Sequence, residues 1–194
     1  MKMRSMLVVF GLTLFLVGPA LAQQRAYNPF PPYELNIHAG GLFPDEGDSN
    51  GLLGTRFMLH KASGWGFGGN FDWVPIGDDD TGFDEAVDVN RYLYSFEVDY
   101  TFQSDNPLRF FTGAGLGAAS TRISDAPDEI DDLQTDFLLP LAIGLKWFNR
   151  MDNPSWAIRV DVRDNIIWFE RANGDTDPDN NWEVSAGFSI LFGE

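Results

Sequence analysis

The chain of 194 residues contains no cysteine, which excludes disulfides, cysteine-ligated zinc and thiol catalysis. Basic residues are scarce, because 13 Lys and Arg stand against 29 Asp and Glu and give a formal net charge of −16. This shortage argues against a nucleic-acid partner, since little positive charge is available to neutralise phosphates. With 44% hydrophobic and 14% aromatic residues, the chain is nevertheless too rich in apolar side chains to be disordered.

Long hydrophobic runs are also lacking, apart from one at the N-terminus. Residues 1–22 have the features of a secretory signal peptide, with Lys2 and Arg4 ahead of the apolar run Met6 to Val17. The small residues of Ala20-Leu21-Ala22 predict cleavage after the second alanine. A retained membrane helix is the alternative, but the run is short for a span of about 20 residues. The absence of cysteine excludes a lipoprotein anchor.

A proline-rich segment, residues 23–32, is expected to form an extended lead-in, and eight segments with period-two alternation follow it. Regularly spaced strands with turn signals between them are typical of an all-β sandwich or barrel. Connections after the first, third, fifth and seventh segments are long and acidic, and the others are short turns. In an up-and-down barrel all long loops then lie at one end, as in outer-membrane barrels. The predicted strands are 33–43, 51–61, 64–75, 89–103, 108–122, 136–149, 155–169 and 181–192.

The apolar faces of these strands decide between a water-soluble barrel and a membrane barrel. Phe96 and Val98, for example, alternate with Glu97 and Asp99. The many large rings would overfill the narrow lumen of eight strands, so we expect them to face outward into lipid. Aromatic residues near both strand ends predict interfacial girdles. They are Trp65, Tyr100, Phe102, Phe110, Trp147, Phe148, Trp156 and Phe192 at the short-turn end, and Phe43, Trp73, Tyr92, Phe137, Trp168 and Trp182 at the long-loop end.

The signal peptide, the eight amphipathic strands, the loop lengths and the ending Phe188-Ser189-Ile190-Leu191-Phe192 resemble the small outer-membrane β-barrels of the OmpA/OmpX type. The resemblance covers residues 33–194 and implies an eight-stranded antiparallel up-and-down transmembrane β-barrel in a Gram-negative-type outer membrane. It implies recognition of the terminal aromatic residue by the barrel-assembly machinery. We also expect a periplasmic N-terminus, contact with outer-membrane lipid, and bridging of the acidic loops to lipopolysaccharide by divalent cations. Gly193 and Glu194 follow that residue, which departs from the family pattern. The periplasmic peptidoglycan-binding domain of the OmpA proteins is not carried over.

The polar faces contain acidic and basic residues in balance, which we expect to pair inside the lumen because an unpaired buried charge is costly. A structural plug is the first interpretation, and a narrow ion path is the second. A catalytic site is the third, although the two histidines are accompanied by no G-x-S-x-G motif. In the seventh segment Asp164 interrupts the outward row, which predicts a bulge or an exit from lipid. The predicted lumen network comprises Glu34, His38, Arg56, Asp72, Arg91, Glu97, Asp99, Arg109, Lys146, Arg159, Asp161, Arg163 and Glu183.

Most of the excess negative charge lies in the four long connections, at 44–50, 76–88, 123–135 and 170–180. Runs of carboxylates usually form solvated surfaces that keep loops apart. Binding of divalent cations is the alternative, because hard cations prefer carboxylate oxygens. Residues 175–180 resemble the start of a calcium loop, although the loop's usual Gly and closing Glu are missing. No other cofactor is expected.

Together these patterns predict a non-enzymatic, monomeric outer-membrane barrel with a structural or surface-interaction role through its acidic loops. A narrow porin-like channel for ions or small solutes is the alternative.

Overall fold

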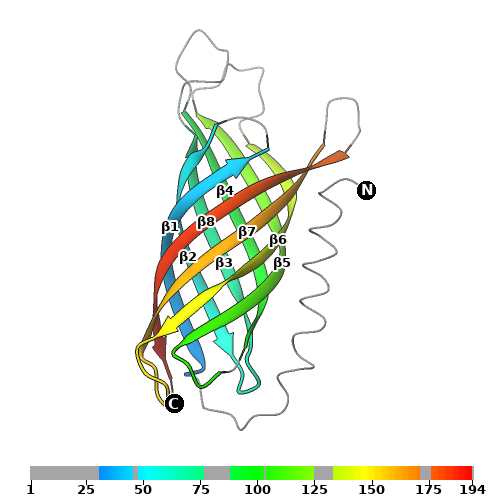
Figure 1. Cartoon of the computed structure of the whole chain (residues 1–194). Helices are drawn as coiled ribbons and strands as arrows, with labels where there is room; N and C mark the ends of the chain where they lie inside the picture. Colours follow the sequence, from blue (N-terminus) through cyan, green and yellow to red (C-terminus); the bar gives the residue numbers. More distant parts are fainter. Residues whose placement is uncertain are drawn as a thin grey trace.

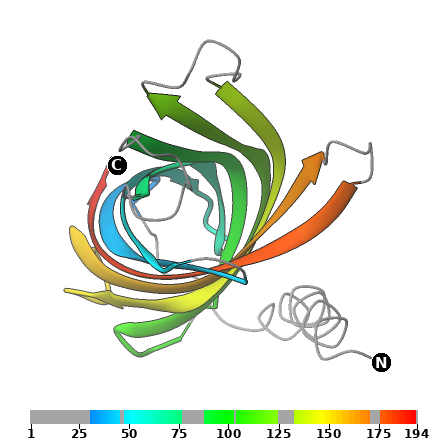
Figure 2. The same ribbon diagram turned by 90° about the horizontal axis from the view of Figure 1, so that it is seen from above.

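A computed structural model describes residues 31–45, 48–76, 88–102, 104–124, 133–170 and 176–193. The predicted signal peptide and residues 23–30 lie outside the described residues. Eight antiparallel strands pair in chain order, and β1 pairs with β8 to close the barrel (Figures 1 and 2). The predicted fold class is therefore confirmed. The strands are β1 (Tyr33–Pro44), β2 (Asn50–His60), β3 (Trp65–Ile76), β4 (Asp88–Thr101), β5 (Leu108–Ser124), β6 (Leu133–Phe148), β7 (Trp156–Glu170) and β8 (Thr176–Phe192).

Two hairpins extend further than the alternation predicted. β6 begins at Leu133 instead of residue 136, and β8 begins at Thr176 instead of residue 181, whereas the other strand ends agree within two residues. The added residues are mostly polar and do not alternate with apolar residues. The sequence pattern therefore gives no sign of a strand there, and only the backbone pairing shows it. Asp177 and Asp179 lie in this extension, paired with β7. This part of the segment is therefore strand rather than loop, and the binding of a divalent cation there stays a prediction.

The register of the strands is continuous around the barrel. Asp164 pairs with Leu141 on one side and Trp182 on the other, so the bulge predicted there is wrong. Pro140, which has no N–H, interrupts the β5–β6 ladder without shifting its register. Directly paired residues lead once around the wall and return to β1 ten residues further on, a stagger that tilts the strands and sets the lumen width. This path runs Tyr33, Leu59, Phe67, Val98, Ala114, Leu141, Asp164, Trp182, Phe43.

The wall is apolar outside and polar inside. Phe96 and Ile143 are 59% and 43% exposed, whereas Glu97 and Lys146 are 5% and 1% exposed. Arg56 is among the largest side chains that are fully buried. This distribution is the reverse of a water-soluble barrel and is the one that lipid stabilises. None of the described residues forms a helix long and apolar enough to cross a membrane.

Aromatic side chains pair near both ends of the wall, where a membrane has its interfaces. At the short-turn end the rings of Trp147 and Trp156 are 5.6 Å apart, and at the long-loop end those of Phe137 and Trp168 are 5.3 Å apart. Phe148 is the exception, because it was predicted for the outer girdle but faces the lumen and is 2% exposed. Its parity on β6 matches that of the inward residue Lys146.

Candidate functional site in the barrel lumen

Charged side chains from seven strands meet in the middle of the lumen. Each is at most 5% exposed, and each stands on the inward set of its strand because successive side chains alternate across a strand. We call this group the central ionic layer. Its members are Glu34, His38, Arg56, Asp72, Glu97, Asp99, Lys146, Arg159, Asp161, Arg163 and Glu183, eleven of the thirteen residues predicted for the lumen.

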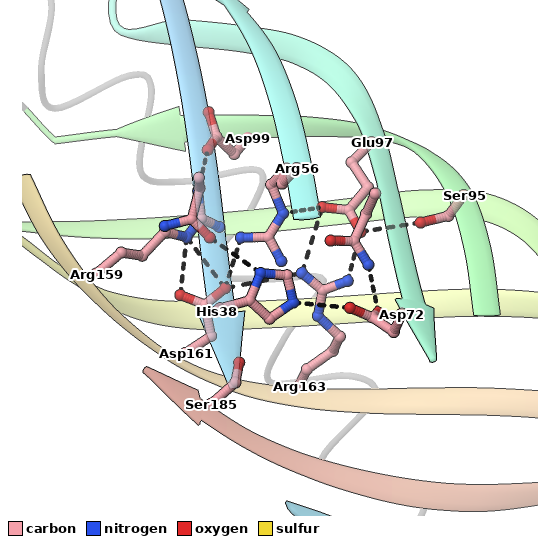
Figure 3. Close-up of polar contacts among 12 residues, drawn as sticks. His38, Arg56, Asp72, Ser95, Glu97, Asp99, Arg159, Asp161, Arg163 and Ser185 are labelled. Carbon is pink, nitrogen blue, oxygen red and sulfur yellow. Dashed lines mark hydrogen bonds and ion pairs between the residues drawn. The ribbon is translucent and has the colours of Figure 1, made fainter. Parts of the chain in front are cut away.

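Asp161 lies among the three arginines of this layer (Figure 3). Its Oδ1 accepts a hydrogen bond from Arg159 Nε at 2.8 Å, and its Oδ2 accepts one from Arg56 Nη1 at 2.8 Å. Arg163 Nη2 lies 3.7 Å from the same Oδ2. Three guanidinium groups thus surround one carboxylate, which compensates the cost of burying them.

Glu97 bridges two of these arginines from the opposite wall. Its carboxylate accepts hydrogen bonds from Arg163 and lies 3.3 Å from Arg56 Nε. Ser95, two residues earlier on β4, donates its hydroxyl to the same carboxylate at 2.9 Å. Because the planar guanidinium groups engage it from two strands, Glu97 ties β4 to β2 and β7 across the barrel.

Lys146 forms the link toward the short-turn end. Its ammonium lies 3.0 Å from Glu34 Oε2 and 3.2 Å from Asp99 Oδ2. Arg159 Nη1 lies 3.3 Å from the same Asp99 oxygen. The Arg159 guanidinium also lies 3.9 Å from the ring centroid of Phe111, a buried cation–π contact.

The chain's two histidines each contact a buried carboxylate. His38 Nε2 lies 2.7 Å from Asp72 Oδ1, and His60 Nε2 lies 2.7 Å from Glu34 Oε2. His60 was not included in the predicted network, although it shares the inward parity of Arg56 on β2. His38, Asp72 and Glu183 are also the described residues that could hold a metal ion, because one ligand atom from each lies within 4.8 Å of the others.

Two predicted members lie at the ends of the lumen. Arg91 is half-buried toward the long-loop end, where its Nε donates to Thr121 Oγ1 at 3.3 Å. Arg109 is buried toward the short-turn end, with its guanidinium 5.1 Å from the ring centroid of Phe148. One of these two arginines therefore lies on each side of the central ionic layer along the barrel axis.

Apolar side chains close the lumen on both sides of the charges, which the sequence analysis did not predict. Toward the short-turn end, Phe148, Ala157 and Leu191 form a small buried cluster. Toward the long-loop end, seven strands each contribute one residue to a layer that we call the upper apolar layer. Its members, all at most 3% exposed, are Leu42, Leu52, Val74, Leu93, Ala119, Leu138 and Ile167.

A signal for the upper apolar layer was present in the sequence. Consecutive apolar residues occur where each strand approaches a long loop, as in Leu52-Leu53, Leu138-Leu139 and Ile166-Ile167. In a strand, two neighbours point to opposite faces, so such a pair places one apolar side chain inside and one outside.

Several solved structures share this architecture. Neisserial surface protein A matches with a TM-score of 0.64 at 14% identity, over 83% of this chain and 97% of its own. The outer membrane protein OprG from Pseudomonas aeruginosa matches with a TM-score of 0.53 at 13% identity, over 86% and 99%. The N-terminal β-barrel domain of Pseudomonas aeruginosa OprF matches with a TM-score of 0.51 at 16% identity, over 82% and 97%.

These similarities establish the fold, which is that of the small transmembrane barrels of outer membranes. No protein-family description matches the sequence, and no curated protein matches it either. A more specific role must therefore be argued from the lumen and the loops of this chain.

Proposed function

We propose that the chain is a structural outer-membrane protein that acts through its surface loops and does not conduct. The observation that carries the proposal is the filling of the lumen, where the central ionic layer lies between apolar groups at both ends. A structural role needs a rigid and stable wall, and the cross-barrel ion pairs supply that rigidity. The acidic loops then provide the surface that other molecules meet.

The proposed orientation follows from the asymmetry of the connections. The four long, acidic loops face the exterior, and the short turns face the periplasm, as is usual for such barrels. β1 begins at the short-turn end (Figure 1), which supports the proposal that the chain enters the barrel from the periplasmic side, with a periplasmic N-terminus. Most of the loop carboxylates lie outside the described residues. Their proposed surroundings are lipopolysaccharide and divalent cations, while the barrel-assembly machinery acts on the strands during insertion.

A narrow channel is the competing function, and the lumen opposes it in two ways. A hydrated ion would have to break hydrogen-bonded pairs such as Arg56 with Asp161, which leaves buried charges uncompensated. It would also have to pass the upper apolar layer, which offers no polar side chain to replace its water. Conduction therefore requires a rearrangement of both layers.

Single-channel recording in planar bilayers tests the proposal. The refolded chain, checked by heat-modifiable gel migration, is expected to give no discrete current steps. The double variant Leu93→Ser/Leu138→Ser is the matched comparison, because it places hydroxyls in the upper apolar layer and leaves the charged layer intact. Discrete steps from the unmodified chain would contradict the proposal and support the channel.

A further inference from the structure

The contact between His38 and Asp72 depends on the residue between them. Gly54 on β2 is the direct partner of His38 on β1 and of Asp72 on β3, so the two side chains come from strands that are not neighbours. A Cβ at residue 54 would collide with the Asp72 carboxylate and with the His38 ring. The missing side chain therefore creates the space in which the imidazole and the carboxylate meet.

A chain of hydrogen bonds fixes the orientation of His38. The Glu34 carboxylate can only accept hydrogen bonds, so the Ser189 hydroxyl, 2.7 Å away, donates its proton to it. The Ser189 oxygen in turn accepts a hydrogen bond from Asn36 Nδ2 at 3.0 Å. Asn36 then presents its Oδ1 to His38 Nδ1 at 3.0 Å. The Nδ1 atom consequently carries the proton, as metal-binding histidines do when an oxygen acceptor holds the other ring nitrogen.

The remaining ring nitrogen faces oxygen atoms. With the proton on Nδ1, a neutral His38 turns the lone pair of Nε2 toward Asp72 Oδ1, only 2.7 Å away. Two acceptors at this distance repel each other unless a cation lies between or beside them. Within 4 Å, the described cationic group paired with Asp72 is His38 itself, while the Arg163 guanidinium acts electrostatically on the same carboxylate from further away. A carboxylate oxygen of Glu183 lies within 4.8 Å of both ligand atoms and provides a third side.

Neighbouring polar groups hold the two carboxylates in place. Asn70 donates to the second oxygen of Asp72, while Asn165 Nδ2 and Ser185 Oγ donate to Glu183 at 3.0 and 2.9 Å. The Oδ1 atom of Asn70 is itself buried and has no hydrogen-bond partner among the described residues, so a further oxygen is available beside the cluster. Such outer contacts are typical of ligated carboxylates.

The guanidinium group of Arg163 is always positively charged and would repel a metal ion bound between these residues. Its Nε lies 3.7 Å from Glu183 Oε2, but its other nitrogens engage Glu97 and approach Asp161. Two carboxylates outside the proposed ligand set therefore offset its charge. Figure 3 shows Arg163 beside the His38–Asp72 pair, with Glu97 on its far side.

We propose that His38, Asp72 and Glu183 form a buried site for a divalent transition metal of the zinc class. One imidazole nitrogen and two carboxylate oxygens are ligands that zinc accepts at about 2.0–2.2 Å, with a fourth position left for another oxygen. Ligands of a tetrahedral ion at that distance are about 3.3 Å apart, between the 2.7 Å and 4.8 Å seen for this cluster. The upper apolar layer covers the site, so the metal enters while the barrel closes.

The test is refolding of the chain in detergent with Co²⁺, followed by gel filtration, metal analysis and visible absorption spectroscopy. We expect one Co²⁺ per barrel, with an absorption band that Zn²⁺ removes when it is added during refolding. His38→Gln and Glu183→Gln are expected to lose the bound metal. His60→Gln is the matched control, since His60 also contacts a buried carboxylate but lies outside the ligand set, and it should retain the metal.

Measurements on the unmodified chain alone keep the proposal testable if the ligand variants fail to fold. Refolding with EDTA should lower the urea midpoint of unfolding, and refolding with Zn²⁺ should restore it, because the metal binds only the closed barrel. The proposal is overturned if the unmodified barrel carries no Co²⁺ or Zn²⁺ after refolding. It is equally overturned if nitrogen NMR in the presence of Zn²⁺ finds both ring nitrogens of His38 protonated. A proton, rather than a metal ion, would then lie between His38 Nε2 and Asp72.

Discussion

The central ionic layer and the upper apolar layer occupy the same lumen, yet they exclude water by different physical means. In the ionic layer, Asp161 is surrounded by guanidinium groups, so specific partners compensate the burial of charge. In the apolar layer, residues such as Leu93 and Leu138 need no partner and are stabilised by packing alone. The comparison teaches that the ionic layer fixes which strands face each other, whereas the apolar layer closes the end of the barrel.

The largest effect is expected from removing the centre of the ionic layer. Asp161→Ala leaves several buried guanidinium charges short of a partner and should lower the free energy of unfolding by about 3–5 kcal/mol. Urea unfolding of the barrel in lipid vesicles measures this change. Val162→Ala, one residue further on β7 but facing outward, is the control. A loss for Asp161→Ala no greater than that of the control would show that the ion pairs do not stabilise the barrel.

A second substitution breaks the apolar layer instead. Leu138→Ala removes a side chain that is 1% exposed and should cost about 2–5 kcal/mol, the range for cavities in close-packed interiors. The same urea titration gives the value, and Leu139→Ala, on the outward face of β6, is the matched control. If the two variants were equally stable, the upper layer would be loosely packed and the comparison between the layers would fail.

The smallest loss of stability is expected from a substitution that crowds one contact within the ionic layer. Gly54→Ala introduces a Cβ where His38 and Asp72 meet and should cost about 1–3 kcal/mol, as overpacking usually does. Gly51→Ala is the control on the same strand, because nothing lies within 4 Å of its added Cβ. Its effect should stay within about 0.5 kcal/mol in the same titration. Equal effects of the two variants would mean that the space over Gly54 is not confined.

The sequence predicts the wall better than the lumen. Alternation of Phe96 with Glu97 suffices to assign the outward and inward faces, because the narrow lumen of eight strands cannot hold all the large rings of the apolar faces. The contact of His38 with Asp72 was not predictable, since it depends on register across three strands. The upper apolar layer was missed for a different reason. The polar inner face ends at apolar residues such as Leu42 and Leu52 before the loops begin, and only the consecutive apolar pairs signal that change.

Closure between the first and last strands has a practical consequence. Tyr33 pairs directly with Phe192, so the two ends of the barrel's chain meet at one rim. A short peptide joining them would complete the ring of strands without crossing the membrane. New ends could then be opened at the exposed Ala62 and Ser63 between β2 and β3, which makes this protein suited to circular permutation. Such a permutant would begin with β3 and end with β2, while every strand would keep its two neighbours in the wall.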